Sequence, residues 1–314
     1  MGLACVDIVI HLNSPIPLGA HGVCVALGMF DGVHLGHQHV VRQAWLDARA
    51  LGARSVAVTF DPHPQSIVAP ERAPKLLQPL AERVRFLSEL GLDAILVCQF
   101  DESLSRVSGE QFIRNLARGF GQLRSFTVGE GFRFGHRRSG DVDLLRRLAV
   151  ELNYTMHAAA PIRIGDEIVS STRIRGALRV GNLGMTTELL GRPYTLAGPV
   201  QPGDRLGRKL GFPTANLAVE GLELPPHGVY AVRARVQGNE WLGALNLGQR
   251  PTVAGLHPPL RCEIHLLDFA GDIYGQNLVV EFAARLRDEQ RFDGVEALRA
   301  QIARDIDAVR RLLA

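Results

Sequence analysis

The sequence predicts an α/β protein with a Rossmann-like parallel sheet in its N-terminal part, followed by an antiparallel β-barrel and a C-terminal helix. Through about residue 185, short apolar runs alternate with amphipathic helical segments, an order typical of a parallel sheet. Beyond residue 193 the runs become β-rich and are separated by Gly and Pro, which indicates a closed antiparallel sheet. A chain of 314 residues can form two domains. We expect them at residues 1–185 and 186–314.

The N-terminal part contains apolar runs that we expect to be strands and segments with apolar residues at steps of three and four that we expect to be helices. The strands are residues 23–27, 55–60, 94–97 and 125–128, and the helices are residues 38–51, 80–90, 109–120 and 142–152. Ligands of such sheets bind at the carboxyl ends of the strands.

The C-terminal part is expected to be a barrel covered by one helix. Its strands are residues 194–200, 228–236, 241–247, 262–267 and 278–283. A helix follows Asp293, whose side chain can form a capping box with Glu296. We expect this helix to pack against the barrel through one apolar face, formed by Val295, Leu298, Ile302, Ile306, Val309 and Leu313.

Composition excludes several classes of protein. The formal net charge is only +3 and acidic residues accompany the arginines throughout, so nucleic acid is not an expected partner. Cys5, Cys24, Cys98 and Cys262 are far apart in the sequence and are expected to be reduced core residues. Neither a basic leader nor a membrane span is recognisable, so we expect a cytoplasmic protein.

The segment Gly28-Met-Phe-Asp-Gly-Val-His-Leu-Gly-His37 lies between an expected strand and an expected helix. It therefore places His34 and His37 at the carboxyl edge of the sheet, beside the unpaired amides of a helix that begins near Gly36. Gly28 and Gly32 would let a polyphosphate approach the backbone, and the imidazoles would stabilise charge on phosphorus. The segment predicts a site of attack on ATP.

Two other interpretations of these residues are weaker. His34, His37 and His39 could bind a metal ion, but no Cys or carboxylate lies at ligand spacing. The glycines of residues 129–135 resemble a dinucleotide fingerprint, but their spacing is wrong and no helix is expected to begin there. Neither the P-loop pattern nor the His-Glu-x-x-His zinc pattern occurs in the chain.

Further polar stretches end strands or begin helices in the N-terminal part, at residues 60–64, 128–135 and 169–175. Because they belong at one edge of the sheet, a single crevice could contain all of them. His63, between two prolines, could equally be a rigid turn residue.

The stretch 169–175 is the most informative of these. Ser170, Ser171 and Thr172 can cap a helix and donate hydrogen bonds to phosphate oxygens, while Arg173 or Arg175 supplies positive charge. Alone, such a run is usually only a helix cap. Together with the two histidines it suggests nucleotidyl transfer, with magnesium neutralising charge and no covalent enzyme intermediate.

A second candidate site lies in the β-rich part. The glycine-containing loop 207–216 can surround phosphates, and Thr214 and Asn216 offer oxygen ligands to magnesium. Glu263 and His265 alternate with apolar residues in a strand and could project toward the barrel mouth, where a carboxylate could deprotonate an alcohol. A simple turn and a solvated strand face explain the same residues and are slightly favoured when these residues are considered alone.

Nine short motifs occur in order over nearly the whole chain, and the set is more specific than its members. They are Gly28-x-Phe-Asp-Gly-x-His-x-Gly-His37, Pro62-His-Pro64, Gly129-Glu-x-Phe-Arg-Phe-Gly135, Ser170-Ser-Thr-x-x-Arg175, Leu190-Gly-Arg-Pro193, Gly211-Phe-Pro-Thr-Ala-Asn216, Gly228-Val-Tyr230, Arg250-Pro-Thr252 and Glu263-x-His-Leu-Leu-Asp-Phe269. Together they resemble the bacterial bifunctional riboflavin kinase/FAD synthetase family.

The resemblance implies two ATP-dependent and magnesium-dependent activities. A C-terminal barrel would phosphorylate riboflavin to FMN, and an N-terminal domain of the nucleotidyltransferase type would adenylylate FMN to FAD with release of pyrophosphate. The implied partners are therefore the small molecules riboflavin, FMN and ATP, with no nucleic acid and no membrane.

The resemblance also implies residue roles. His34 and His37 would stabilise the transition state at the α-phosphate, and Glu263 would activate the ribityl 5′-hydroxyl. The nucleotide and its phosphates would bind to Gly28, Phe30, Asp31, Gly36, Ser170, Ser171, Thr172 and Arg175 in the N-terminal site and to Gly207, Lys209 and Gly211 in the barrel. The flavin would be bordered by Phe60, Pro62, His63 and Phe132, and magnesium would be bound by Thr214 and Asn216.

The chain departs from the family pattern at one position, and three other functional interpretations remain. The family usually has Asn or Asp where this chain has Gly131, so a hydrogen bond to the FMN-adenylylating site's substrate is expected to be missing. One alternative is adenylyl or cytidylyl transfer to another phosphate ester, with the barrel as a binding appendage. Another is a flavin-responsive binding protein without catalysis. A tRNA-synthetase-like enzyme is disfavoured, because the chain is short and lacks a large basic surface.

Overall fold

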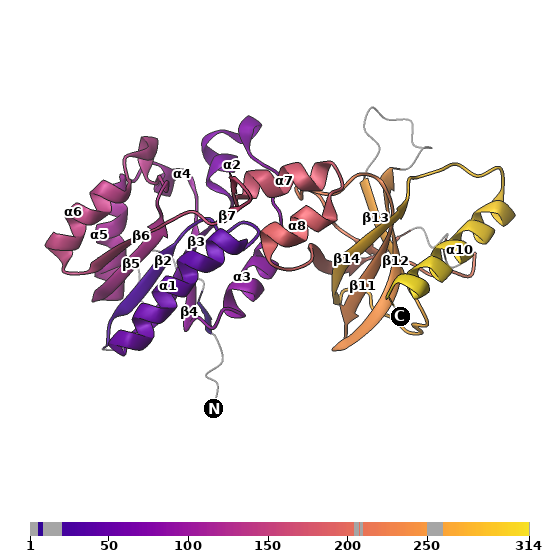
Figure 1. Cartoon of the computed structure of the whole chain (residues 1–314), viewed down its shortest axis with the longest axis horizontal. Coiled ribbons are helices and arrows are strands. Elements are labelled where there is room, and N and C mark those ends of the chain that lie inside the picture. The colour runs from indigo at the N-terminus through magenta and orange to yellow at the C-terminus, as the bar shows by residue number, and fades with distance from the viewer. Residues whose placement is uncertain (1–5, 9–20, 204–206, 208–209, 250–259, 314) are drawn as a thin grey trace. The chain divides into compact units, whose positions relative to one another are not determined.

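Figure 1 shows a computed structural model of the chain, which describes residues 6–8, 21–203, 207, 210–249 and 260–313. Cys5, Lys209 and the Arg250-Pro-Thr252 motif lie outside the described residues. The chain divides into two compact units. The N-terminal unit contains Met1–Lys75 and Leu80–Ser171, and the C-terminal unit contains Leu76–Pro79 and Thr172–Ala314.

The N-terminal unit is built on a six-stranded parallel sheet with the order β1-β4-β3-β2-β5-β6, which confirms the predicted architecture. All four expected strands are present, and two strands were not predicted, the short β1 and the edge strand β6. The strands are β1 (Val6–Ile8), β2 (Val23–Leu27), β3 (Arg54–Asp61), β4 (Ala94–Gln99), β5 (Leu123–Gly129) and β6 (Thr155–Ala159).

The four expected helices of this unit are also present, and two of them match the predicted bounds at both ends. They are α1 (Leu35–Leu51), α3 (Leu80–Ser88), α5 (Gly109–Phe120) and α6 (Val142–Leu152). Short elements join them and were not predicted: α2 (Pro64–Val68), η1 (Pro70–Arg72), α4 (Glu102–Ser105), η2 (His136–Arg138), β7 (Arg163–Ile164) and β8 (Glu167–Ile168). Two further helices, α7 (Ser171–Arg179) and α8 (Leu183–Leu190), lead into the C-terminal unit.

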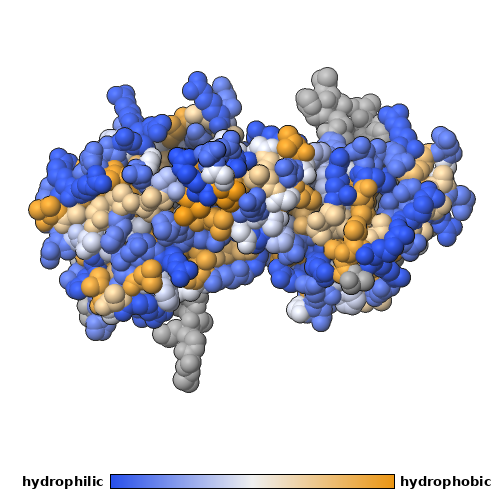
Figure 2. Space-filling view, viewed as in Figure 1, coloured by the Kyte–Doolittle hydropathy of each residue, from blue (hydrophilic) through white to orange (hydrophobic). Residues whose placement is uncertain are grey.

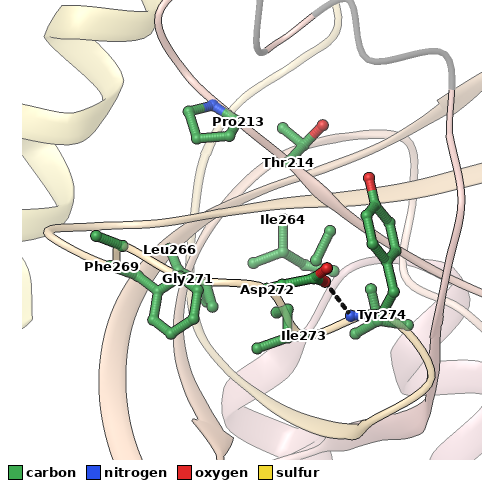
Figure 3. A pocket seen from close by; sticks show the side chains of 12 residues that line it. Pro213, Thr214, Ile264, Leu266, Phe269, Gly271, Asp272, Ile273 and Tyr274 are labelled. Carbon is green, nitrogen blue, oxygen red and sulfur yellow. Dashed lines mark hydrogen bonds between the residues drawn. The ribbon is translucent and has the colours of Figure 1, made fainter.

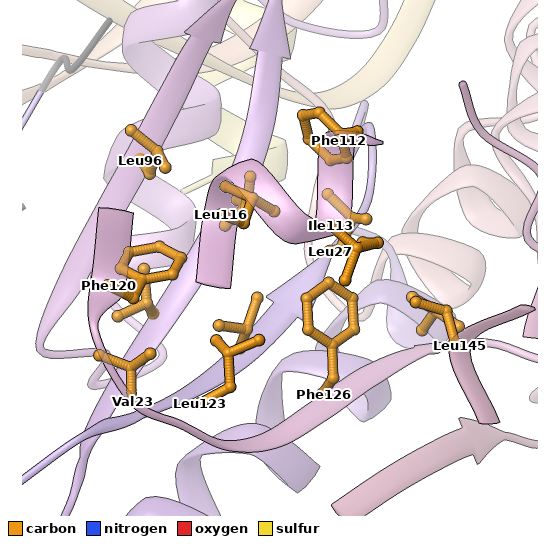
Figure 4. Close-up of a cluster of buried hydrophobic side chains, with 14 of the residues drawn as sticks. Val23, Leu27, Leu96, Phe112, Ile113, Leu116, Phe120, Leu123, Phe126 and Leu145 are labelled. Atoms are coloured by element: carbon orange, nitrogen blue, oxygen red, sulfur yellow. The ribbon is translucent and has the colours of Figure 1, made fainter. Parts of the chain in front are cut away.

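Strand β2 is buried on both faces, which explains its continuous apolar sequence. Val23, Val25 and Leu27 pack on one face with residues of α5 and α6, in the cluster drawn in Figure 4. Ala26, on the other face, packs with residues of α1 and α3. Helices therefore cover both faces of the sheet, and the loops at the ends of the strands are the parts left to bind ligands.

The C-terminal unit contains a closed six-stranded antiparallel barrel with the order β10-β13-β12-β11-β14-β9, as predicted. Tyr230 and Phe282 meet in its interior, with ring centroids 5.2 Å apart. The strand β10 was not predicted, because it has only three residues and only Thr214 separates it from Pro213. The strands are β9 (Thr195–Gln201), β10 (Ala215–Leu217), β11 (Gly228–Val236), β12 (Asn239–Gln249), β13 (Leu260–Leu266) and β14 (Asn277–Arg287).

The segment just before α3 belongs to the C-terminal unit although it interrupts the N-terminal unit in sequence. The backbone N–H of Leu76 donates to the carbonyl of Gly221 (2.9 Å), and the N–H of Glu223 donates to the carbonyl of Leu76 (2.7 Å). Gln78 is buried and accepts a hydrogen bond from Arg192 at 3.3 Å. The C-terminal unit is therefore assembled from two separate pieces of the chain.

Helix α10 (Val295–Leu313) lies along β11, β12 and β14 (Figure 1). Ile306, Val309 and Leu313 pack against the barrel as expected. The expectation was wrong for Val295, which is 57% exposed because the first turns of the helix bury little apolar surface. A polar contact contributes instead, since the buried Asp305 accepts hydrogen bonds from the Nε of Arg287, at 3.0 and 3.1 Å, and from its Nη2, at 2.8 Å.

Hydrophilic residues cover most of the face of the molecule seen in Figure 2. Along the described part of the chain, the model contains no helix whose length and apolar character would let it cross a membrane. Cys24, Cys98 and Cys262 are buried free thiols, as expected for reduced core residues. Burial raises the pKa of Cys98 and of Cys262 to about 12, so both are uncharged core groups near neutral pH.

The Arg287–Asp305 pair predicts a stability difference. Replacing Asp305 with Ala should leave the Arg287 guanidinium without its carboxylate and lower the free energy of unfolding of the barrel by about 3 kcal/mol. The measurement is urea unfolding followed by Trp241 fluorescence in a Trp45→Phe background, which removes the other tryptophan. Asp307→Ala, at an exposed position of the same helix, is the control and should change stability by less than about 0.5 kcal/mol. Equal effects of the two changes would contradict the prediction.

Candidate active sites

The first site lies where three neighbouring parallel strands end. Strand β2 pairs with β3 on one side and with β5 on the other. The loops that follow them, residues 28–34, 62–63 and 130–135, therefore leave the same edge of the sheet. The loops after β2 and β5 and the segment after β3 thus lie at one edge of the sheet, as the sequence predicted.

The imidazole of His34 is the N-cap of α1. Its backbone is extended (φ −72°, ψ 171°) and its Nδ1 accepts the backbone N–H of His37 at 3.3 Å. The helix therefore begins at Leu35, earlier than expected, because a histidine acts as its cap. Since Nδ1 is an acceptor, the proton of the neutral His34 ring is on Nε2.

The two histidine rings are stacked. Their centroids are 3.6 Å apart, the angle between the rings is 18°, and His34 is buried. Residues three apart at a helix N-terminus project from neighbouring positions, so the cap and the first turn place both rings together. The structure thus unites the two catalytic candidates beside the first amides of α1, where an anion is favoured.

Phe30 explains one of the glycines in this loop. It has a positive φ of 53° and is buried, and its ring lies edge-on to His37 with centroids 5.4 Å apart. A Cβ at Gly28 would lie 2.7 Å from the Phe30 ring, and a Cβ at Gly36 would lie 3.1 Å from the ring of His34. In this structure the aromatic and imidazole rings occupy the space that we expected for polyphosphate.

The loop is connected to the start of α7. The hydroxyl of Ser171 donates to the backbone carbonyl of the buried Asp31 at 2.8 Å. Ser170 is half-buried beside it. The structure therefore brings these two serines to the histidine loop. Thr172 is exposed and Arg175 is buried on the continuation of α7, in the C-terminal unit.

The flavin candidates at the end of β3 and just after it, Phe60, Pro62 and His63, have different environments. Phe60 is buried in the apolar core, with its ring centroid 5.8 Å from that of Phe112. Pro62 follows a cis peptide bond. His63 is the N-cap of α2, since its Nδ1 accepts the N–H of Gln65 at 3.1 Å. It is therefore a helix cap and not only the rigid turn residue that its two neighbouring prolines suggested.

The loop after β5 contains Phe132, which is half-buried and stacks on Phe134 with centroids 5.6 Å apart. Gly131 is exposed, and a Cβ added there would meet nothing within 4 Å. The backbone at Gly131 would therefore accept a side chain, so packing does not explain the departure from the family pattern.

Arg83 in α3 was not predicted from the sequence as a site residue. Its guanidinium is buried and donates to the backbone carbonyl of Met29 at 3.0 Å and to Asp61 at 3.2 Å. Burial lowers the pKa of Arg83, and the charges of Asp61 and Asp31 oppose that shift. Arginine in an amphipathic helix is normally expected at the surface. The available signal was its position on the same helix face as the buried Leu87.

The second site is in the barrel, where a cavity of about 430 Å³ opens beside β10 and β13 (Figure 3). The Asp272 carboxylate accepts the backbone N–H of Tyr274 at 2.9 Å and so shapes the turn at its edge. Asp272 and Tyr274 were not singled out from the sequence, although a Gly-Asp-Ile-Tyr-Gly turn after a strand was an available signal. Phe269 was included only as the last residue of a family motif. The cavity is lined by Val200, Pro213, Thr214, Ala215, Ile264, Leu266, Phe269, Ala270, Gly271, Asp272, Ile273 and Tyr274.

The register of the barrel brings Asn216 and Glu263 together. Asn216 in β10 lies directly opposite Glu263 in β13, so their side chains are neighbours on one face. Interpreting Pro-Thr-Ala-Asn as a simple turn was therefore wrong, because its last two residues pair in the barrel. Cys262 and Ile264 are buried, which places Glu263 and His265 on the opposite, outer face of the wall.

The polar groups near Glu263 are held by specific contacts. Its carboxylate forms an ion pair with Arg261 at 3.1 Å, and His265 Nδ1 lies 2.8 Å from the carbonyl of Pro213. Arg261 and Asn216 also line a second cavity of about 350 Å³. Residues of β10 therefore line both cavities, Ala215 the first and Asn216 the second.

The glycine loop before β10 is only partly described, and Lys209 lies outside the described residues. The carbonyl of Gly207 accepts the N–H of Phe212 at 2.8 Å. Gly211 has a φ of +90°, a conformation that favours glycine. Among the residues that the structure describes, no three His, Cys, Asp or Glu side chains cluster as metal ligands would.

The fold and the two sites define a class of protein, a two-domain transferase with a nucleotidyltransferase-type α/β unit and a separate barrel that carries its own polar site. Comparison with known proteins identifies the family. Residues 18–173 match the family model described as FAD synthetase, and residues 190–313 match the model described as riboflavin kinase. The chain belongs to the bifunctional riboflavin kinase/FMN adenylyltransferase family.

Relatives match this chain over most of its length. It is 41% identical to the bifunctional riboflavin kinase/FMN adenylyltransferase of Pseudomonas fluorescens and 38% identical to that of Escherichia coli K12, each over 94% of both chains. A crystal structure of a protein described as a macrolide-efflux protein from Streptococcus pneumoniae matches with a TM-score of 0.81 and 28% identity, over 96% of this chain and 99% of that chain. The two family models carry the functional assignment, since each covers one unit.

The chain is therefore an enzyme with two activities, an FAD synthetase in the N-terminal part and a riboflavin kinase in the barrel. The alternatives that treat the barrel as a binding appendage, or the whole chain as a binding protein, are not supported. The resemblance to this family is confirmed.

The cap formed by His34 predicts a stability difference between two variants. His34→Ala removes the side-chain acceptor and should lower the free energy of unfolding by about 1 kcal/mol, whereas His34→Asn retains an acceptor and should stay within about 0.5 kcal/mol of the wild type. Urea unfolding followed by Trp45 fluorescence in a Trp241→Phe background measures the difference, because Trp45 is in α1. Equal stability of the two variants would show that the imidazole does not cap the helix.

Proposed function

We propose that the N-terminal site transfers the adenylyl group of ATP to FMN with His34 and His37 as the catalytic residues. The stacked pair at the N-terminus of α1 is the observation that carries this proposal. In the transition state, charge develops on the oxygens of the α-phosphate. A ring that donates from Nε2, beside the first amides of a helix, is suited to stabilise that charge. Both rings have fixed orientations, so little reorganisation is required.

The residues around the pair complete the proposed nucleotide site. Ser170 would donate a hydrogen bond to the leaving pyrophosphate. Ser171 donates its one hydroxyl proton to the Asp31 carbonyl in this structure, so it would have to release that contact in order to donate to the pyrophosphate as well. The motif alone assigns Thr172 and Arg175 to the same triphosphate. Four further residues of the site would act mainly by fixing the shape of the histidine loop. They are Gly28, Phe30, Asp31 and Gly36.

For the flavin, we assign Pro62 and His63, which follow β3, and Phe132, which follows β5, to the border of the FMN site. Phe60 would support this border from the core, since it is buried there. The adenylyltransferase function would then occupy residues 1–185 and the kinase function residues 186–314. The two family models and the C-terminal barrel support this division.

The barrel site would phosphorylate riboflavin with ATP. Glu263 would accept the proton of the ribityl 5′-hydroxyl as that oxygen attacks the γ-phosphate. The isoalloxazine ring suits the cavity of about 430 Å³, whose lining combines apolar and aromatic side chains with polar groups that include Thr214 and Asp272. Gly207, Lys209 and Gly211 would cover the phosphates.

Magnesium would be bound in the barrel by the Thr214 hydroxyl and the Asn216 amide oxygen. Both are oxygen donors, which Mg²⁺ prefers, and Asn216 is the cross-strand neighbour of the proposed base Glu263. Magnesium supplies charge neutralisation at the ATP phosphates when it is bound. The protein residues supply the orientation of the hydroxyl and the acceptor for its proton.

The catalytic role of His34 is tested by the pair of variants already described. His34→Asn and His34→Ala should both lower the rate of FAD formation from FMN and ATP by about 10²–10³-fold, the scale of a lost electrostatic donor. Riboflavin phosphorylation should be unchanged in both. Chromatographic assay of FMN and FAD separates the two steps. If His34→Asn, with its helix cap retained, formed FAD at the wild-type rate, the catalytic assignment would be wrong.

The role of Glu263 predicts the opposite result. Glu263→Gln keeps the size of the side chain but removes the base, and should lower riboflavin phosphorylation by about 10²–10⁴-fold. FMN supplied directly should still become FAD. Glu240→Gln, at a half-exposed position of β12 paired with Arg233, is the matched control and should leave both activities intact. A change at Glu263 that abolished both activities in a folded protein would contradict independent sites.

A further inference from the structure

We infer that Arg83 is a positioning residue for FMN adenylylation, acting through the Met29 carbonyl and Phe30 on the ring of His37. The inference rests on the proposed function of the histidine pair. Arg83 touches neither histidine. It lies in α3, on the side of the sheet that also carries α1.

The Arg83 side chain is 2% exposed, and its contacts end on the two loops that carry the proposed site. One terminal nitrogen donates to the carbonyl of Met29 at 3.0 Å, in the histidine loop. The other donates to Asp61 at 3.2 Å, at the end of β3 and one residue before Pro62. A planar guanidinium with two directed donors can fix both groups at once.

The contact with Met29 controls the conformation of the next residue. The same carbonyl also accepts the hydroxyl of the buried Thr59 at 2.9 Å, so both of its lone pairs are used and the peptide plane between Met29 and Phe30 is fixed. Phe30 then takes its positive φ of 53°, which a non-glycine residue rarely adopts. The resulting direction of the Phe30 ring places its edge against His37 at 5.4 Å.

The loop then closes toward the helix cap. The N–H of Val33 donates to the carbonyl of Phe30 at 3.0 Å, and Val33 also has a positive φ, of 39°. Non-glycine residues are strained in this region of backbone conformation, and such a conformation persists only where surrounding contacts determine it. Arg83 and Thr59 supply such contacts at the first of the two residues.

Stability alone does not explain an arginine at this position. Burying its charge is costly, Asp61 remains 39% exposed, and among the described residues the Nε of Arg83 has no hydrogen-bond partner. An apolar side chain of similar length would avoid these costs, and Asp61 could be solvated. The arginine is therefore expected to contribute more to the geometry of the loop than to the stability of the fold.

The test is a comparison of Arg83→Met and Arg83→Lys with the wild type in the full-length enzyme. Arg83→Met should lower kcat for FAD formation about 10- to 100-fold, since a displacement of about 1 Å at a reacting group has an effect of this size. The KM values for FMN and ATP, riboflavin phosphorylation and the thermal midpoint should change little. Arg83→Lys, which has one donor nitrogen in place of two, should lower kcat about threefold to tenfold.

Arg85→Met is the matched control on the same helix. Arg85 is a half-exposed partner of the buried Glu82, at 2.7 Å, and its removal should lower the thermal midpoint while kcat stays at the wild-type value. Arg83→Met should thus lower kcat with little change in the thermal midpoint, whereas Arg85→Met should lower the thermal midpoint with little change in kcat.

Either of two results would overturn the inference. One is a wild-type kcat in Arg83→Met or, if that variant does not fold, in Arg83→Lys. The other is a loss of activity that appears only together with a loss of folded protein. Wild type and His34→Asn are assayed in parallel. If His34→Asn retained full FAD synthesis, the proposed function would be wrong. If His34→Asn lost FAD synthesis but Arg83→Met remained fully active, only the role of Arg83 would be refuted.

Discussion

The parallel pairing of β2 with both β3 and β5 is the constraint on which the N-terminal site depends. Because helices cover both faces of this sheet, the polar groups that perform chemistry can only lie beyond the ends of the strands. Adjacent parallel strands end at the same edge, so segments from distant parts of the sequence meet there. The histidine loop, the segment after β3 and the loop after β5 are neighbours for this reason, and α1 begins among them with its positive dipole end.

The barrel reaches a similar result with different geometry. Antiparallel register, and not a shared strand end, makes Asn216 and Glu263 neighbours. In both units one polar group also has a structural contact: His34 caps α1, and Glu263 is paired with Arg261. These contacts hold the side chains in one orientation before a substrate arrives, which lowers the cost of reorganisation during the reaction.

Much of the fold could be predicted from the sequence because its local signals agree with one another. Helices α5 and α6 match the predicted bounds, and each begins after a favourable cap residue, Ser108 and Asp141. The early start of α1 could not be predicted in the same way, because histidine is an unusual N-cap. The same holds for β10, whose three residues are too few to show a period.

The candidate sites were predicted as motifs, and the contacts that organise them were not. A motif can indicate that His34 and His37 act together, but it cannot show that their rings stack. Arg83 is far from the motif in sequence, and its role depends on a tertiary contact with a backbone carbonyl, which leaves no mark on local composition. The Asn216–Glu263 pair depends in turn on strand register, which only the folded barrel defines.

The hydrogen bonds of Leu76 with the backbone of Gly221 and Glu223 have a consequence for dissecting this enzyme. A gene fragment that encodes only the second half of the chain would lack the partner of these backbone groups, and Arg192 would lose Gln78. Conversely, a fragment that encodes only the first half would contain the segment Leu76–Pro79 without its hydrogen-bond partners at Gly221 and Glu223. The boundary between the two catalytic functions in the sequence therefore differs from the boundary between the two folded units. A recombinant C-terminal half should include the segment Leu76–Pro79.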